Sequence, residues 1–289
     1  MQPRQLTILG VGLLGGSIGL AMRSAAPRCR IIGWGHRLQS LQLARQMGAI
    51  DQAETDLAAA VARSDMVILC TPIGTFETIL RQIASGLSRG CLVTDVGSTK
   101  RSIVRWADSI LDKKVNFVAS HPIAGSDRRG VEFARADLFK NHLCIVTPTS
   151  TTRATALKAI GSFWKMLGMR VAQLSADEHD RLLADVSHLP HLLAAALVAM
   201  QDEPALRLCG QGFLDATRIA GGDGGLWRDI LLDNADNLRG GMTRFQAEVS
   251  RVMNMLESGE PDALRNWLSA AAQRRQILVD QKLREMRAD

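Results

Sequence analysis

The 289-residue sequence contains no tyrosine, and aromatic residues make up only 4% of it. Any mechanism in which a tyrosine–lysine pair transfers protons is therefore excluded. Cysteine is also scarce: the five cysteines are odd in number, and no two of them form a CxxC pair. A disulfide framework is not expected, and a reducing, cytoplasmic compartment is the natural location.

Proline is rare too, with 8 residues, and the chain has no low-complexity tract or internal repeat. Hydrophobic residues make up 46% and charged residues 22%, which is the composition of an ordered globular protein. Residues 5–22 carry no charge and could be mistaken for a signal peptide, but five glycines interrupt them and suit a turn better. No other stretch is expected to span a bilayer.

The formal charge of +6 suggests anionic partners. These could be nucleic acid, or a phosphorylated cofactor together with a carboxylate substrate. Arginine and lysine are scattered along the chain, and those near the C-terminus alternate with apolar positions of a helical pattern. We therefore expect a small-molecule substrate, with no binding to nucleic acid or to a membrane.

Short apolar runs of strand type alternate with helical segments as far as residue 175. This pattern predicts an α/β fold, a Rossmann-type doubly wound parallel sheet in a domain over residues 1–175. Helical patterns then cover about 176–200, 226–256 and 261 to the end, so we expect an all-helical domain over residues 176–289. Its apolar surface predicts a homodimer. The expected strands are 6–9, 31–34, 66–70, 92–95, 117–120, 143–146 and 170–174.

The first expected strand leads directly into a GxGxxG pattern formed by Gly10, Gly12 and Gly15. After a strand and before a helix, such glycines allow a tight turn, close approach of a pyrophosphate, and close packing of helix on strand. The pattern therefore predicts a dinucleotide cofactor rather than a purely structural turn.

The second expected strand is followed by Gly35, His36 and Arg37 in place of the acidic residue that usually binds the ribose of NAD. A cation and a ring donor there would bind a 2′-phosphate, although an ordinary solvated loop has the same composition. We therefore expect NADP to be preferred, with NAD possible. The candidate cofactor-binding residues are Gly10, Gly12, Leu13, Leu14, Gly15, His36, Arg37, Thr71 and Pro72.

Histidine is the residue left for proton transfer, and His121 is the strongest candidate. It follows an apolar run at the edge where ligands bind in open α/β sheets, although it could be a buried histidine bonded to the backbone. Ser98 could cap a helix or lie beside the nicotinamide. His188 and His191 have only Asp185 nearby at helical spacing, so no metal site is expected.

Five segments, taken in order, resemble the prephenate and arogenate dehydrogenases of tyrosine biosynthesis. The most specific of them contain HPIAG, SHLPH and TRIA. The resemblance covers residues 8–230. The segments are ILGVGLLGGSIGLAM (8–22), DVGSTK (95–100), SHPIAGSDRRGVEFARADLF (120–139), VSHLPHLLAAALV (186–198) and TRIAGGDGGLWRDI (217–230).

The resemblance implies an NAD(P)-dependent oxidative decarboxylation and roles for individual residues. His121 would accept a hydrogen bond from the ring hydroxyl at C4 while C4 gives up hydride, and Ser98 would orient both. Arg218 would bind a substrate carboxylate, where the residues alone also allow a surface ion pair. Substrate contacts are further implied for His188, His191 and Ser126, and positions near the pocket for Asp127, Asp215 and Trp227.

Two positions depart from the family pattern: Gly35 replaces the acidic ribose contact, and Gly224 stands where proline is frequent. No acidic residue is identifiable as a partner for the ammonium group of arogenate, so the choice between the two substrates stays open. Another two-domain dehydrogenase, of the β-hydroxyacid or pyrroline type, and an NADP-binding sensor without turnover are the alternatives.

Overall fold

The computed structural model describes residues 2–125 and 128–287. Contacts within the chain group it into two compact units, residues 1–235 and residues 236–289. The first unit contains both sheets and the helices around them, and the second consists of long helices.

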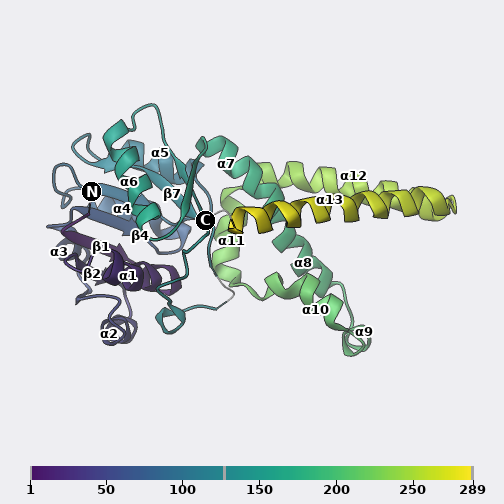
Figure 1. Cartoon of the computed structure of the whole chain (residues 1–289), viewed down its shortest axis with the longest axis horizontal. Helices are drawn as coiled ribbons and strands as arrows, with labels where there is room; N and C mark the ends of the chain where they lie inside the picture. Colours follow the sequence, from purple (N-terminus) through teal and green to yellow (C-terminus); the bar gives the residue numbers. More distant parts are fainter. Residues whose placement is uncertain (1, 126–127, 288–289) are drawn as a thin grey trace. The chain divides into compact units, whose positions relative to one another are not determined.

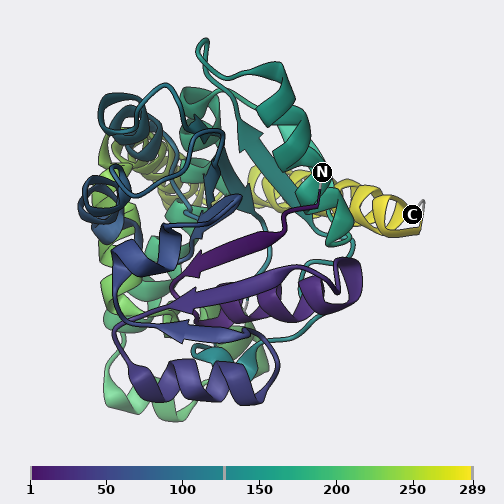
Figure 2. The ribbon, with the colours of Figure 1, turned by 90° about the vertical axis from the view of Figure 1, so that its left-hand side faces the viewer.

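Six parallel strands form the main sheet, in the order β3-β2-β1-β4-β5-β6 (Figure 2). The strand order reverses between β1 and β4, and in open α/β sheets ligands bind in the crevice at such a reversal. The predicted Rossmann-type sheet is confirmed, with one strand, β3, that its polar sequence did not signal. The strands are β1 (Gln5–Leu9), β2 (Arg30–Trp34), β3 (Gln52–Glu54), β4 (Met66–Leu69), β5 (Leu92–Asp95) and β6 (Asn116–Phe117).

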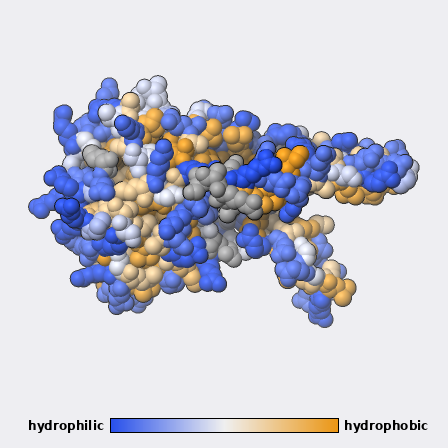
Figure 3. All heavy atoms as spheres, in the orientation of Figure 1, coloured by the Kyte–Doolittle hydropathy of each residue, from blue (hydrophilic) through white to orange (hydrophobic). Residues whose placement is uncertain are grey.

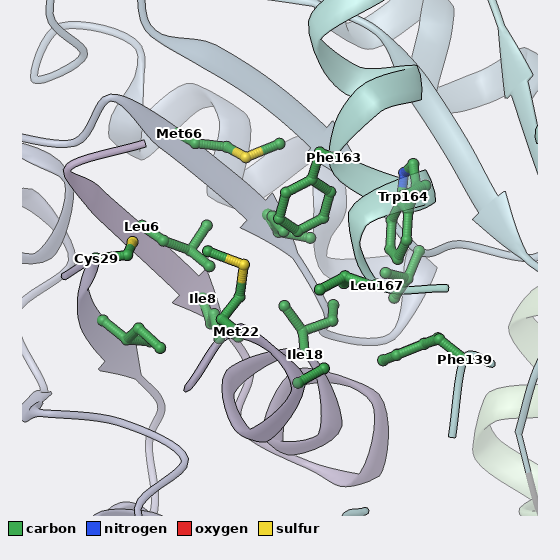
Figure 4. Close-up of a cluster of buried hydrophobic side chains, with 14 of the residues drawn as sticks. Leu6, Ile8, Ile18, Met22, Cys29, Met66, Phe139, Phe163, Trp164 and Leu167 are labelled. Carbon is green, nitrogen blue, oxygen red and sulfur yellow. The ribbon is translucent and has the colours of Figure 1, made fainter. Parts of the chain in front are cut away.

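Helices cover both faces of this sheet, and a hydrophobic cluster fills each interface. Leu6 and Ile8 of β1 belong to one cluster and Leu9 to the other, because side chains of a strand alternate between faces. Figure 4 shows the first cluster, where Met22 of α1 and Phe163 of α6 approach β1. The helices are α1 (Leu13–Ala25), α2 (Leu38–Gln46), α3 (Leu57–Val61), α4 (Phe76–Ile83), α5 (Arg101–Ile110) and α6 (Ala154–Met166).

A second sheet contains β7 (Ala119–Pro122), β8 (Leu143–Thr147) and β9 (Arg170–Gln173). Strands β7 and β8 are antiparallel, and β8 and β9 are parallel. The expectation of one strand over 117–120 in a single parallel sheet is therefore wrong. The chain leaves the main sheet after Val118, whose N–H still bonds to the carbonyl of Val93, and then pairs with β8.

The expected helix over 176–200 is divided into α7 (Ala176–Leu183), a π-helical turn (Ala184–His188) and α8 (Leu189–Ala199). By length and composition alone, Ala176–Ala199 could cross a membrane, which corrects the expectation that no such stretch lies beyond residue 22. Its His179 and Asp180 are nevertheless fully buried against the rest of the first unit. Three further helices complete this unit: α9 (Glu203–Arg207), α10 (Gln211–Thr217) and α11 (Gly224–Asp233).

The second unit is a helical hairpin of α12 (Ala235–Glu257) and α13 (Pro261–Arg287) (Figure 1). Gly259, with φ +65°, provides the left-handed residue of the connecting turn. Trp267 donates a hydrogen bond to Glu248 across the hairpin. Apolar residues lie among hydrophilic ones along both helices (Figure 3), and half of the large apolar side chains of α12 are exposed.

Candidate active site

A cavity of about 710 Å³ lies at the crevice of the main sheet. Loops that follow β1, β4, β5 and β7 form its wall together with the segment from residue 218 to 230. Of the predicted site residues, Gly12, Leu13, Leu14, Arg37, Thr71, Pro72, Ser98 and Arg218 line it. Gly10, Gly15, His36, His121, His188 and His191 do not.

The glycine turn has the geometry that a dinucleotide requires. Gly10 has φ +100°, and a Cβ on Gly15 would lie 2.2 Å from the backbone oxygen of Gly10. By contrast, a Cβ on Gly12 would meet no atom within 4 Å. Gly12 is also the N-cap of α1 and provides no side-chain cap, so the first N–H groups of α1 are available to an anion. These residues fit a pyrophosphate.

The two cationic candidates after β2 are placed differently. Arg37 lines the cavity. The ring of His36 packs edge-on against Trp34, with centroids 4.7 Å apart, and the indole N–H of Trp34 donates to the carbonyl of Thr55. Only Arg37 is therefore positioned as predicted.

Arginine dominates the charge of the cavity wall. Arg128 and Arg129 line it in addition to Arg37 and Arg218, and Arg129 forms an ion pair with Asp223. Arg218 is exposed and makes no ion pair or hydrogen bond with any residue that the structure describes. Such a wall favours anionic ligands.

His121 lies on β7 just behind the wall and is 9% exposed, and Ala124 and Gly125, in the loop that follows β7, line the cavity. Its Nδ1 lies 2.8 Å from Nε2 of His179, whose own Nδ1 lies 2.8 Å from the Asp180 carboxylate. Within residues 2–125 and 128–287, Nε2 of His121 has no hydrogen-bond partner. The predicted catalytic histidine is therefore the end of a buried chain of three side chains.

Burial lowers the pKa of His121 well below its usual value, and His179, Lys100 and His188 lower it further by charge repulsion. Burial likewise lowers the pKa of His179, although Asp180 opposes that change. Both imidazoles are therefore neutral at physiological pH, so each ring has one donor and one acceptor nitrogen.

Asp180 also holds the start of α5. Its carboxylate accepts the backbone N–H of Lys100 at 2.7 Å and of Arg101 at 2.9 Å. The prediction that Ser98 could cap this helix is wrong, because α5 begins at Arg101 and the cap comes from another helix. Ser98 does not cap α5 and lines the cavity.

A buried ion pair fixes the loop that carries Ser98. The ammonium group of Lys100 contacts the carboxylate of Asp95 at the end of β5, and both side chains are fully buried. Asp95 also accepts the N–H of Gly97 at 2.8 Å and of Ser120 at 3.0 Å. The same carboxylate thus connects the end of β5 to β7, which carries His121.

The two other histidines flank Trp227, which lines the cavity. His191 stacks on it, with centroids 3.5 Å apart and an angle of 11° between the rings, and His188 lies edge-on at 6.3 Å. Nδ1 of His188 lies 3.1 Å from Nδ2 of Asn234, and burial lowers the pKa of His188 to about 4. Both histidines thus support the wall from behind.

Three predictions remain: a substrate contact for Ser126, and positions near the pocket entrance for Asp127 and Asp215. Ser126 and Asp127 lie outside the described residues. Asp215 is exposed, does not line the cavity, and accepts a hydrogen bond from Gln211. No cluster of three or more potential metal ligands occurs in the described parts of the chain.

Two family models match this chain almost end to end: the prephenate dehydrogenase nucleotide-binding domain over residues 18–173, and the prephenate dehydrogenase dimerization domain over residues 175–270. The chain belongs to the prephenate dehydrogenase family. The predicted family is thus confirmed, and with it a nicotinamide-dependent oxidoreductase of tyrosine biosynthesis.

Members of the prephenate dehydrogenase family resemble this chain in sequence and in structure. A prephenate dehydrogenase of Bacillus subtilis is 33% identical over 92% of this chain and 74% of its own length. A cyclohexadienyl dehydrogenase of Zymomonas mobilis is 31% identical over 90% of this chain and 91% of its own. The structure of the Aquifex aeolicus prephenate dehydrogenase with hydroxyphenyl propionate and NAD+ has a TM-score of 0.90 and 31% identity, covering 96% and 99% of the two chains.

Sequence reasoning missed several residues of this family site. His179 and Asp180 lie in the polar run from Asp177 to Arg181, which has the composition of an exposed first turn of a helix. They are buried because α7 packs against α5 and against the second sheet. Arg128 and Arg129 follow the HPIAG segment and were read only as part of the resemblance. The domain boundary at residue 175 stays a prediction: the family models meet there, whereas the compact units meet after Ala235.

Proposed function

We propose that this protein catalyses the oxidative decarboxylation of prephenate or arogenate. Hydride leaves C4 of the cyclohexadienyl ring, the C1 carboxylate departs as carbon dioxide, and its bonding electrons complete the aromatic ring. A bound nicotinamide dinucleotide supplies the hydride acceptor. Formation of an aromatic product makes the reaction favourable, so the protein must mainly align C4 and stabilise the positive charge that develops on the hydroxyl.

The observation that carries this proposal is a buried histidine just behind the cavity wall, His121, whose Nε2 forms no hydrogen bond with any described residue. His121 Nε2 accepts the hydrogen bond of the C4 hydroxyl, and Ser98 orients that hydroxyl. The guanidinium group of Arg218 binds a substrate carboxylate, which is supported by its exposure, by its place in the cavity wall and by the lack of a partner among the described residues. His191 and His188 hold Trp227 at the substrate side of the cavity. A substrate contact of Ser126, which lies outside the described residues, is proposed from the family resemblance alone.

The decisive experiment replaces the imidazole of His121 by an amide. We expect His121→Asn to lower kcat by about 100-fold to 10,000-fold, the range that a positioned acid–base group contributes, with the Kd of the cofactor unchanged. Turnover is measured with prephenate and with arogenate, each against NAD and NADP, and cofactor affinity by calorimetric titration. His142→Asn, on an exposed histidine, is the control. A kcat of His121→Asn within a few-fold of wild type would exclude this role.

NADP is the cofactor that we propose is preferred. Arg37 supports it, because this residue lines the cavity and lies shortly after β2, where a carboxylate would repel a 2′-phosphate. We expect Arg37→Ala to raise the KM for NADP at least tenfold, equivalent to about 1.4 kcal/mol, and the KM for NAD by less than twofold. Equal losses for both cofactors would show that Arg37 does not contact the 2′-phosphate.

We also propose that the protein works as a homodimer in the cytoplasm. The family's dimerization domain and the exposed apolar side chains of α12 support the first point. Five unpaired cysteines support the second. The expectation that neither nucleic acid nor a membrane is a partner stays a prediction.

A further inference from the structure

We propose that His179 and Asp180 are positioning residues that fix the tautomer of His121, with the proton on Nδ1 and the lone pair on Nε2. The inference rests on the proposed function, in which Nε2 accepts the hydrogen bond of the substrate hydroxyl. Its basis is the chain of contacts from the start of α5 through α7 to β7.

The direction of each hydrogen bond follows from the carboxylate end of the chain. Asp180 accepts the backbone N–H groups of Lys100 and Arg101, which can only donate, and the side-chain Nε of Arg101 at 3.3 Å. An ionised carboxylate has no proton to give, so Nδ1 of His179 must donate to it at 2.8 Å. Nε2 of His179 is then an acceptor, and at 2.8 Å it receives the proton of His121 Nδ1. Nε2 of His121 is left with the lone pair.

The ionisation of Asp180 is consistent with this direction. Burial opposes it, but the bonds from His179 and from the backbone of Arg101 and Lys100 outweigh burial and lower the pKa of Asp180. The backbone of Asp180 is held as well, because Nδ2 of Asn234 donates to its carbonyl at 2.7 Å. Asp180 is thus an ionised residue held by hydrogen bonds at both its side-chain carboxylate and its backbone carbonyl.

The groups around His121 favour its neutral form. Lys100 comes from the segment after β5 and is paired with Asp95 at the end of that strand. His179 comes from α7 and His188 from the π-helical turn. On β8, Cys144 faces the backbone of His121, and burial raises the pKa of its thiol above the physiological range. Among the described residues, His179 is the one that forms a hydrogen bond with the His121 ring, so His179 decides the position of its single proton.

The rejected tautomer would remove the proposed chemistry. If Nε2 of His121 carried the proton, it would donate toward the substrate hydroxyl and could not accept the proton as C4 becomes a carbonyl. The same problem arises in serine proteases when the buried aspartate is replaced by asparagine, where the histidine adopts the wrong tautomer. Asp180 and His179 together do for His121 what one aspartate does there.

Variants of His179 test the proposal because one of them removes the hydrogen-bond acceptor for His121 and another replaces the ring but keeps an acceptor. His179→Leu removes the acceptor for His121, and we expect kcat to fall on the order of 100-fold while the Kd of the cofactor stays unchanged. His179→Gln retains an oxygen acceptor at a similar reach, and we expect it to restore kcat to within about tenfold of wild type. Asp177→Asn, on an exposed carboxylate of the same helix, is the matched control and should leave kcat unchanged.

Nitrogen-15 NMR of histidine-labelled full-length protein saturated with NADP+ reads the tautomer directly. The His121 signal is assigned as the one that His121→Asn removes. We expect a protonated Nδ1 in wild type and in His179→Gln, and a mixture with protonated Nε2 in His179→Leu. Asp180→Asn should shift the population the same way, because its amide can donate to Nδ1 of His179 and reverse both bonds.

Each outcome decides one of the two proposals. A His179→Leu variant with kcat within twofold of wild type overturns the inference, and so does an unchanged His121 tautomer in both His179→Leu and Asp180→Asn. If His179→Leu does not fold, the tautomers in Asp180→Asn and His179→Gln still give the answer. If His121→Asn itself turns over normally, the proposed function fails, whereas an inactive His121→Asn beside an active His179→Leu removes only the positioning chain.

Discussion

At the scale of single residues, the unusual feature is how many histidines are buried. Four of the six histidines, at 121, 179, 188 and 191, are at most 9% exposed, and burial lowers the pKa of each. A histidine with a lowered pKa in the folded state binds its proton more readily after unfolding. Its contribution to stability is therefore present above the unfolded pKa of about 6.5 and is lost as the pH falls toward the folded value.

The stability of the protein should therefore depend on pH in the acidic range. The free energy of unfolding should fall steeply from pH 6.5 toward pH 4, by about 1.4 kcal/mol per pH unit for each buried histidine that is still neutral. His188, whose pKa burial lowers to about 4, contributes across that whole window. Urea unfolding at fixed protein concentration measures this slope. His188→Phe removes one buried histidine, so its unfolding free energy should change less with pH, by about 1.4 kcal/mol per pH unit. His142→Asn should keep the wild-type pH dependence. Equal slopes in wild type and both variants would contradict the burial argument.

At the scale of elements, the turn between β1 and α1 separates two roles of glycine. A Cβ at position 12 meets nothing, whereas a Cβ at position 15 meets the Gly10 carbonyl oxygen at 2.2 Å. Gly12→Ala should therefore leave the melting temperature unchanged and raise the KM of the cofactor about tenfold or more, because the methyl group occupies the space kept for pyrophosphate. Gly15→Ala should destabilise the fold by about 1–3 kcal/mol. If Gly12→Ala bound cofactor normally, the pyrophosphate would not lie on this turn.

Elements with a strong local pattern were predictable from the sequence, and those defined by distant partners were not. The apolar runs predicted β1, β2, β4 and β5, because a strand buried on both faces is mostly apolar along its length. Strand β7 looked like one more of these, since nothing local marks the change of partner from β5 to the antiparallel β8. Strand β3 is short and polar, and only its pairing with β2 makes it a strand.

Residues of the candidate site likewise divide into those that a local motif predicts and those that depend on distant partners. The sequence predicts Ser98, Arg37 and Arg218 as site residues, because each follows or belongs to a motif with a known chemistry, and all three line the cavity. His179 and Asp180 could not be found in this way, because their function lies in contacts with residues about 60 to 80 positions away. His36 was expected beside Arg37, but the neighbouring Trp34 ring holds it away from the cavity wall.

At the scale of the molecule, the hairpin of α12 and α13 buries too few side chains to be stable without a partner surface. In the 23 residues of α12, Leu238 and Gly241 are the only buried residues, and α13 has none among the side chains that the structure describes. Four apolar side chains on α12, at 245, 249, 253 and 256, follow helical spacing and are each between 39% and 57% exposed. A helix with such a stripe needs a partner surface, and the family's dimerization domain extends over it to residue 270.

A charge in that stripe therefore tests the dimer. In a twofold interface one substitution is present in both copies, so Met253→Glu would bury two unpaired carboxylates and should convert the dimer to a monomer at micromolar concentration. Ala247→Glu adds the same charge to α12 at an exposed position. Position 247 lies six residues before 253, about 240° around the helix axis after full turns are removed, so it is on a different face. The Ala247→Glu variant should remain a dimer. Light scattering of both variants and of wild type gives the masses. If Met253→Glu remains a dimer, the subunits associate through another surface, and the exposed stripe on α12 must serve a different contact.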